Sequence, residues 1–182
     1  MKEHRTGCVH LYCGDGKGKT TAALGAALRA SGRGMSVLIL RFLKTDDSGE
    51  IPALANVPGI EVIPCARTFG FSWNMTEEEK REAAVYYRNC LEEGWKRALG
   101  SESESGCDLL ILDEAIGACR QGFLDEERLA VLICGRPASM EVILTGRNPS
   151  PRLMEVADYI TEMKQIRHPY EKGIPAREGI EF

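Results

Sequence analysis

Short apolar runs alternate along the chain with longer segments in which apolar positions follow a helical period. Four segments have the length and continuous apolar character of buried strands: residues 8–13, 35–42, 109–112 and 140–144. Residues 59–64 form a weaker run of this kind. Successive side chains of a strand point to opposite faces, so a strand that is apolar throughout needs cover on both sides. The pattern predicts an α/β fold, with a mainly parallel sheet and helices on both faces.

Two long helical segments are predicted in the first half of the chain. The first runs from Lys19 to about residue 30, is rich in Ala and Leu, and is expected to stop at Gly32. The second begins after Thr76, which with Glu79 has the spacing of a capping box. Its apolar residues recur every four positions and predict a buried stripe, formed by Tyr87, Leu91, Trp95 and Leu99.

Two shorter helices are predicted further along. One covers residues 125–133, and the other begins after Ser150, with Pro151 at the first helical position that suits proline. Residues 44–58 have little apolar content and are predicted to form a loop, and residues 100–106 read as a solvated connector. Neither segment is long enough to separate domains, so we expect residues 1–182 to form a single domain.

The segment between the first strand and the first helix is rich in glycine and ends in Gly-Lys-Thr-Thr. Glycine lets the backbone place successive N–H groups around an anion, and the following helix adds its positive N-terminal end. This succession predicts a phosphate-binding P-loop that holds the triphosphate of ATP. The residues expected to contact the nucleotide are Gly14, Asp15, Gly16, Lys17, Gly18, Lys19, Thr20 and Thr21.

Within this loop, Lys19 and Thr20 carry the predicted chemistry. Lys19 supplies a positive charge for the terminal phosphates, and the Thr20 hydroxyl can ligate Mg²⁺. The usual motif Gly-x-x-x-x-Gly-Lys-Thr requires glycine at position 13, where this chain has Cys13. The loop is therefore a variant of the common one.

A metal-binding carboxylate is expected at the end of a neighbouring strand, and Asp113 and Glu114 follow the run 109–112. Adjacent strand residues point to opposite faces, so we expect only one of the two to face the phosphates directly. In an ordinary ATPase, Asp113 would hold Mg²⁺ and Glu114 would activate water.

Charge, hydropathy and cysteine content argue against a nucleic-acid binder, a membrane protein and a disulfide-bonded secreted protein. A net charge of −4 argues against a general nucleic-acid binder, and no apolar run approaches the 18 residues of a membrane span. The polar start of the chain has no apolar stretch of signal-peptide length, so a cytoplasmic protein is expected. The seven cysteines lack Cys-x-x-Cys pairs and read as buried free thiols in a reducing compartment.

Several motifs occur together in one order: the P-loop, then residues 41–44 (Arg-Phe-Leu-Lys), 70–73 (Gly-Phe-Ser-Trp), 112–114 (Leu-Asp-Glu), 144–147 (Leu-Thr-Gly-Arg), and the ending 172–174 and 179–182. This succession resembles the P-loop ATP:corrinoid adenosyltransferases, also called cob(I)alamin adenosyltransferases, over residues 8–182. The resemblance also accounts for Cys13, because the family's loop lacks the first glycine. It implies a single-domain, RecA-like P-loop fold.

The resemblance implies that the C5′–O bond of ATP is broken. A corrinoid reduced to Co(I) attacks the 5′ carbon, which forms an adenosylcobalamin-type product and releases triphosphate. By the same resemblance Thr20 and Glu114 would hold Mg²⁺, and Lys19, Thr20 and Glu114 would be the catalytic residues. Phe71 and Trp73 match the aromatic pair that packs against the lower face of the corrin ring and displaces the lower cobalt ligand. Spacing alone favours an ordinary strand face for Phe69, Phe71 and Trp73, but the flanking Gly70 and Asn74 together with the resemblance favour the corrin platform.

Further expectations concern partners. The resemblance implies a homodimer, cobalamin or another corrinoid as the second substrate, and an electron donor for Co(II), for example a flavoprotein. Arg147 follows a strand end, where a contact with ATP phosphate and simple surface exposure are both reasonable. Family members often carry a longer N-terminal segment over the active site, so the expectation here is either that a partner subunit covers the corrinoid or that its cover is less complete. The alternatives are a RecA-like ATPase or small-molecule kinase, and a non-catalytic, nucleotide-dependent corrinoid carrier.

Overall fold

The computed structural model describes residues 6–45, 47–67, 69–70 and 74–181. Within this part of the chain six parallel strands form one sheet in the order β3-β2-β4-β5-β1-β6. The strands are β1 (Val9–Cys13), β2 (Val37–Arg41), β3 (Ile60–Val62), β4 (Leu109–Asp113), β5 (Glu141–Thr145) and β6 (Tyr159–Glu162). The predicted parallel α/β sheet is confirmed.

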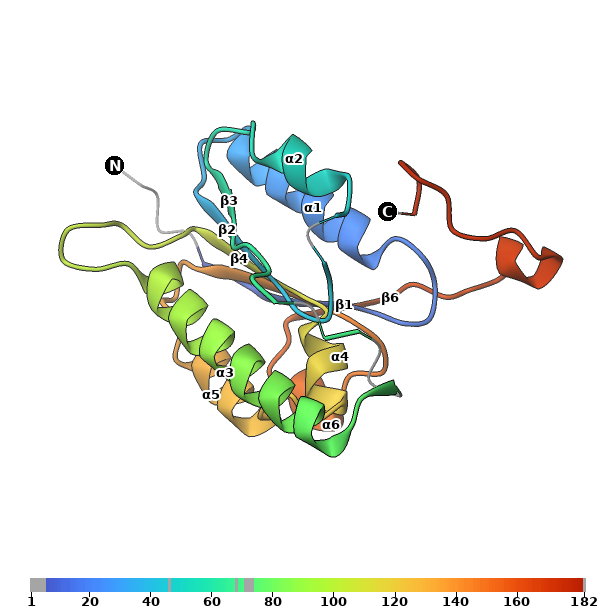
Figure 1. Cartoon of the computed structure of the whole chain (residues 1–182). Coiled ribbons are helices and arrows are strands. Elements are labelled where there is room, and N and C mark those ends of the chain that lie inside the picture. Colours follow the sequence, from blue (N-terminus) through green and yellow to red (C-terminus); the bar gives the residue numbers. More distant parts are fainter. Residues whose placement is uncertain (1–5, 46, 68, 71–73, 182) are drawn as a thin grey trace.

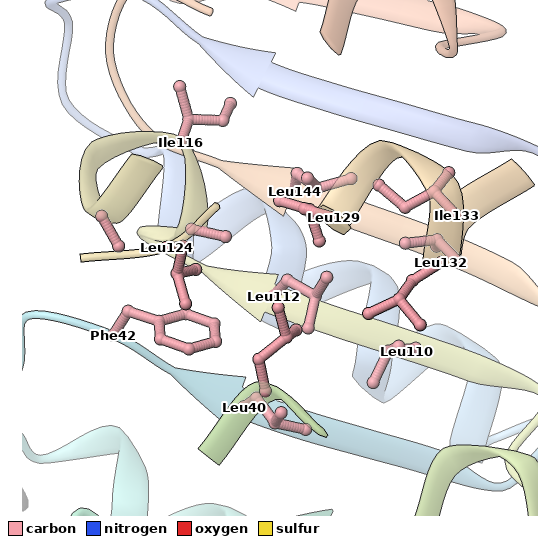
Figure 2. Packing of buried hydrophobic residues seen from close by; sticks show 14 of the residues in the cluster. Leu40, Phe42, Leu110, Leu112, Ile116, Leu124, Leu129, Leu132, Ile133 and Leu144 are labelled. Atoms are coloured by element: carbon pink, nitrogen blue, oxygen red, sulfur yellow. The ribbon is translucent and has the colours of Figure 1, made fainter. Parts of the chain in front are cut away.

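The central strands are apolar throughout because both of their faces are buried. Leu38 and Leu40 of β2 belong to one apolar cluster, whereas Val37 and Ile39 belong to a second cluster on the opposite face. Strand β4 divides its side chains in the same way. Figure 2 shows the first cluster, where side chains of β2, β4 and β5 meet those of α5, among them Leu40, Leu110, Leu112, Leu144, Leu129 and Ile133.

Helices cover both faces of the sheet, as the apolar pattern requires (Figure 1). Helices α1 (Lys19–Ser31) and α2 (Glu50–Leu54) contribute buried residues to the cluster on one face. The opposite face is covered by α3 (Glu77–Leu99), α4 (Ala115–Arg120), α5 (Glu126–Cys134) and α6 (Pro151–Glu155). Helix α3 packs closely on β2, since a Cβ atom at Gly94 would lie 2.1 Å from Leu40.

The predicted helix starts are confirmed in detail. The Thr76 hydroxyl accepts a hydrogen bond from the Glu79 N–H, and the Glu79 carboxylate accepts one from the Thr76 N–H, which completes the capping box. The side chains of Asp125 and Ser150 cap α5 and α6 by accepting from the N–H groups of Arg128 and Leu153. Helix α1 ends at Ser31, with Gly32 as its C-cap.

The apolar stripe of α3 extends less far than predicted. Tyr87, Leu91 and Trp95 are buried, but Leu99 is 45% exposed and Ala98 takes its place in the core. A helix turns about 100° per residue, so a four-residue spacing drifts by about 40° at each step. After three steps the stripe has left the buried face, and the prediction for Leu99 was wrong.

Some elements have no counterpart in the predicted set. Helix α2 lies within residues 44–58, which were expected to form a loop, and it buries one apolar side chain, Leu54. Helix α4 follows β4 directly, and the edge strand β6 and a short 3-10 helix, η2 (Pro169–Lys172), lie near the end of the chain. All four residues of β6 are exposed, so burial left no apolar pattern in its sequence.

All seven cysteines are free, as predicted, but their burial differs from the prediction. Cys13 is buried, five others are partly buried, and Cys134 is exposed. Cys134 is the last residue of α5, whose buried face consists of Leu129, Ala130, Leu132 and Ile133. The Cys134 side chain lies outside this buried face and is therefore exposed. Across the described residues, no helix is long and apolar enough to cross a membrane.

Candidate nucleotide-binding site

The glycine-rich segment forms the turn between β1 and α1, at the edge of the sheet where the parallel strands end. Gly14 and Gly18 have left-handed backbone angles, with φ of 99° and 106°, which side chains other than glycine rarely adopt. Gly18 is the N-cap of α1, so the helix begins with Lys19 and directs its N-terminus toward the turn. The predicted strand, turn and helix are thus present in order.

The segment after β6 packs directly against this turn. The N–H of Gly16 donates to the carbonyl oxygen of Met163 at 2.7 Å, and a Cβ atom at Gly14 or Gly16 would lie 2.5 or 2.6 Å from that oxygen. The Asp15 carboxylate accepts from the N–H of Gln165, which lowers the pKa of Asp15. Gly14 and Gly16 therefore also allow the segment after β6 to pack closely against the turn.

Lys19 lies in the centre of the turn. Its side chain is largely buried, and its Nζ donates to the carbonyl oxygen of Gly16 at 2.6 Å. Burial lowers the pKa of Lys19, and the nearby Glu114 carboxylate opposes that shift. A buried ammonium with one hydrogen-bond partner retains donors for an incoming anion.

Asp113 ends β4 and is the centre of a hydrogen-bonded cluster. It is 1% exposed, and its Oδ1 accepts from the hydroxyls of Thr20 at 2.9 Å and Thr145 at 2.6 Å. Its Oδ2 pairs with the ammonium of Lys44 at 2.5 Å. Residues from four separate segments therefore meet at one carboxylate.

Glu114 follows Asp113 but has left the strand conformation. Its φ of 58° is left-handed, it is the N-cap of α4, and its N–H donates to the Thr145 hydroxyl at 2.8 Å. Burial raises the pKa of Glu114, with a further contribution from Asp113, while Lys44 and Lys19 oppose the shift. The strict alternation of a strand no longer applies here, so Glu114 lies near Lys19 although Asp113 contacts Thr20.

A cavity of about 1090 Å³ opens beside this cluster. Its lining includes residues 17–21, Lys44 and Glu114, together with residues of α1 and α2, residues 45 and 47–49, Phe69 and Gly70, and residues 179–181. We call it the P-loop cavity. The apolar part of its wall includes Leu24, Leu28, Ala53, Leu54, Val57 and Ile180. A cavity lined both by the charged groups of the phosphate loop and by apolar side chains suits a ligand that combines phosphates with ring systems.

The end of the chain returns to the phosphate loop (Figure 1). The Glu181 carboxylate pairs with Lys17 at 2.7 Å and with Arg177 at 3.1 Å, and these contacts lower the pKa of Glu181 to about 2. Gly179 and Ile180 line the cavity between these contacts. The final residues therefore form part of the cavity wall.

The other predicted site residues lie in different surroundings. Thr21 lines the cavity. Arg147 follows β5 and is exposed, and its charge helps to lower the pKa of Lys19 and opposes the rise in the pKa of Glu114. Phe71 and Trp73 lie outside the described residues. The preceding Phe69 is not in a strand and packs against Tyr86 and Tyr87 of α3, at ring-centroid distances of 5.5 and 5.7 Å.

The residues around Thr20 fit a magnesium ion. In the part of the chain that the structure describes, no group of three or more His, Cys, Asp or Glu side chains could form a metal cage. Mg²⁺ needs no such cage in a nucleotide site, where it binds through one or two carboxylates and the substrate's own phosphates. Thr20, Asp113 and Glu114 offer the hydroxyl and carboxylate oxygens that this mode requires.

Sequence reasoning assigned no role to Lys44 or Thr145, although both lie in the quoted motifs. Each follows or ends a predicted strand, and polar residues at strand ends gather at the ligand edge of an open α/β sheet. Their position at strand ends could therefore have identified Lys44 and Thr145 as candidate site residues. The contribution of Gly179 and Ile180 had no comparable signal, because a polar tail does not reveal which part of the fold it contacts.

A phosphate loop between a strand and a helix, with an acidic residue ending a nearby parallel strand, defines the class of P-loop nucleotide-binding proteins. Solved structures of this class share the fold. A KaiC-like protein, PH0186, from Pyrococcus horikoshii superposes with a TM-score of 0.52 and 15% identity, over 90% of this chain and 75% of its own. EssC (ATPases 2 and 3) from Geobacillus thermodenitrificans gives a TM-score of 0.51 and 17% identity, over 96% of this chain and 36% of its own.

The particular family follows from the sequence comparisons. A family model described as ATP:corrinoid adenosyltransferase BtuR/CobO/CobP matches residues 5–182, and the chain belongs to this family. The corrinoid adenosyltransferase of Pseudomonas aeruginosa is 34% identical, over 97% of this chain and 84% of its own length. That of Escherichia coli K12 is 33% identical, over 97% and 86%. The chain is therefore an enzyme that transfers an adenosyl group from ATP to a corrinoid.

Proposed function

We propose that the P-loop cavity binds ATP with its triphosphate against Lys19 and Thr20, and that a Co(I) corrinoid attacks the C5′ atom of the bound nucleotide. The cobalt electron pair forms the Co–C bond, the C5′–O bond breaks, and its electron pair leaves with triphosphate. The observation that carries this proposal is that Lys19 and Thr20, the latter held by Asp113, line a cavity that also has a substantial apolar wall.

The protein's contribution to this step is to stabilise the charge of the leaving group. Lys19 has an ammonium that already lies inside the turn, and the start of α1 adds its positive end. Groups that are fixed before the reaction cost no reorganisation as charge develops, so they favour the transition state over the ground state. Because Arg147 is exposed near Lys19 and Glu114, we propose that it contacts the same triphosphate.

We propose that Thr20 and Glu114 hold Mg²⁺ with the triphosphate. When bound there, the ion would neutralise part of the charge on the leaving group. Asp113 accepts a hydrogen bond from the Thr20 hydroxyl and would orient that ligand from the side away from the metal. This arrangement gives the two neighbouring acids different tasks.

We further propose that Phe71 and Trp73 form an apolar platform for the lower face of the corrin ring. Support comes from Phe69 and Gly70, which lie just before them and line the P-loop cavity. A platform without donor atoms would keep a lower ligand away from cobalt and make Co(II) easier to reduce. Reduction would need an electron donor, for which a flavoprotein is suitable. Residues 1–182 would act as one domain within a cytoplasmic homodimer.

The products of the reaction test the proposed function. Purified protein is incubated with ATP, Mg²⁺ and a chemically reduced Co(I) corrinoid, and the phosphate products are separated by ion-exchange chromatography. We expect adenosylcorrinoid and triphosphate in equal amounts. Release of ADP with phosphate or a phosphoester would instead indicate an ATPase or kinase, and binding of ATP without any product would indicate a carrier.

The division of labour between the two acids has a separate test. Glu114→Gln should raise the Mg²⁺ concentration for half-maximal activity on the order of tenfold or more, because it removes a charged ligand. Asp113→Asn should mainly lower thermal stability, since Asp113 is a buried carboxylate with three partners. Magnesium titrations and melting curves of both variants make the comparison. If only Asp113→Asn raises the magnesium requirement, the two roles are reversed.

A further inference from the structure

The Lys44 ammonium occupies a specific position between the phosphate loop and β4. Its Nζ lies 2.8 Å from the Thr20 hydroxyl oxygen and 2.5 Å from Oδ2 of Asp113. The same Thr20 hydroxyl donates to Oδ1 of Asp113 at 2.9 Å. One cation thus joins the hydroxyl of the P-loop to the carboxylate that ends β4.

A magnesium ion bound to Thr20 needs part of this space. Mg²⁺ binds oxygen at about 2.0–2.1 Å with near-octahedral geometry, and the Thr20 oxygen already donates one hydrogen bond and accepts another. The Lys44 ammonium uses one of the two lone pairs of this oxygen and lies directly beside the other. Two cations at one hydroxyl oxygen would also repel each other strongly in a partly buried site. Lys44 and the metal therefore compete for the same oxygen.

Lys44 is placed so that it can leave without disturbing the rest of the cluster. Its side chain is 25% exposed and lines the P-loop cavity, whereas Asp113 is 1% exposed and remains held by Thr145. The preceding residue, Leu43, has a left-handed φ of 57°, which directs the chain sharply just before Lys44. The lysine is thus attached to a fixed point beside the cavity, with a long side chain that can turn into it.

We propose that Lys44 is a positioning residue that substitutes for the metal in the nucleotide-free enzyme and exchanges with it when magnesium-bound nucleotide enters. In the free enzyme its charge keeps Thr20 and Asp113 aligned. After the exchange the ammonium turns into the P-loop cavity toward the triphosphate. Metal without nucleotide is disfavoured, because it would have to expel the ammonium with no anion to receive it. The inference rests on the proposed magnesium site at Thr20.

Lys44→Met tests the proposal, because it removes the charge but keeps a side chain of similar length. Without nucleotide, the variant should bind Mn²⁺ on the order of tenfold more tightly than the wild type, the equivalent of one charge-assisted hydrogen bond to the competing ammonium. The free-ion signal in electron paramagnetic resonance measures this binding. The variant should also melt at a lower temperature than the wild type when empty, and lose most of that difference with Mg²⁺ and ATP bound.

Lys80→Met is the matched control, since Lys80 forms an exposed ion pair with Glu77 on α3. It should leave Mn²⁺ binding and both melting temperatures near wild-type values. Unchanged or weaker Mn²⁺ binding in Lys44→Met, or an equal loss of stability in the empty and bound states, would overturn the proposal. A purely structural lysine would give that second result.

Wild-type protein provides a test that does not depend on how the methionine variant folds. With ¹³C-labelled lysine, the Lys44 Cε resonance, assigned through Lys44→Arg, should move on addition of Mg²⁺ with ATP and much less with ATP in EDTA. A resonance that stays in place with Mg²⁺ and ATP contradicts the exchange. If ATP stabilises the wild type equally with and without Mg²⁺, the magnesium site itself is wrong, and that result separates its failure from the failure of the exchange alone.

Discussion

Lys19→Ala is expected to abolish adenosyl transfer while the protein remains folded. The Lys19 ammonium donates to the Gly16 carbonyl inside the turn, and Lys19 is not a member of either apolar cluster, so its loss should remove little packing. Loss of a single fixed donor to a developing negative charge typically slows a reaction about 10²–10³-fold. Lys19 carries a full charge, so we expect at least the upper end of that range.

Initial rates with chemically reduced corrinoid measure this effect, and circular dichroism with a melting curve establishes that the variant is folded. Lys80→Ala, on the outer surface of α3, is the matched control and should retain wild-type rates. Binding of ATP should weaken strongly in Lys19→Ala, because the same ammonium is proposed to hold the bound triphosphate. A folded Lys19→Ala protein with near-normal rates would show that the phosphate loop does not serve this reaction.

Replacing both Phe71 and Trp73 with alanine should produce a loss that depends on the electron source. If these rings keep a lower ligand away from cobalt, their task is to make Co(II) reducible, and attack on ATP needs them much less. Activity with a weak biological reductant should therefore fall by on the order of a hundredfold or more, since about 120 mV of potential corresponds to a hundredfold for one electron. Much of the activity should return when a strong chemical reductant supplies Co(I).

Two further measurements separate this role from simple packing. The affinity for ATP should hardly change in the double variant, and the spectrum of bound Co(II) corrinoid should lose its four-coordinate signature. Phe123→Ala is the matched aromatic control: Phe123 is buried, packs on Tyr87 and is not part of the cavity lining, so its loss should lower stability without any dependence on the reductant. If the double variant unfolds or loses ATP binding, Phe71 and Trp73 are core residues.

The sheet could be predicted from the sequence because its central strands are buried on both faces. Burial of β2 and β4 between two layers of helices leaves an unbroken apolar run in each. Strand β6 escaped prediction for the opposite physical reason: it lies at the edge, all of its residues are exposed, and its pairing with β1 depends on backbone groups. Helix α2 was missed because one buried leucine, Leu54, is too little for a periodic signal.

The site was predictable where its chemistry is local in sequence. The turn at residues 14–18 and the opening of α1 at Lys19 follow from residue types within a few positions of one another. The contacts of Lys44, by contrast, could not be predicted from its neighbours in the sequence. The fold brings it to Thr20, 24 positions away, and to Asp113, 69 positions away. Likewise, the need for glycine at position 16 comes partly from Met163, which no local rule connects to the P-loop.

The position of β1 between β5 and β6 affects how the protein is made. Strand β1 leaves the ribosome first among the strands, yet both of its neighbours lie roughly 130 or more residues later in the chain. At a synthesis rate of about 5–20 residues per second, β1 waits on the order of ten seconds for a partner. The P-loop that follows it gains its backbone contact with Met163 only after β6 has also been made. A truncated chain that stops before β5 would therefore carry the whole P-loop sequence with an unpaired apolar strand attached, which is a target for chaperones.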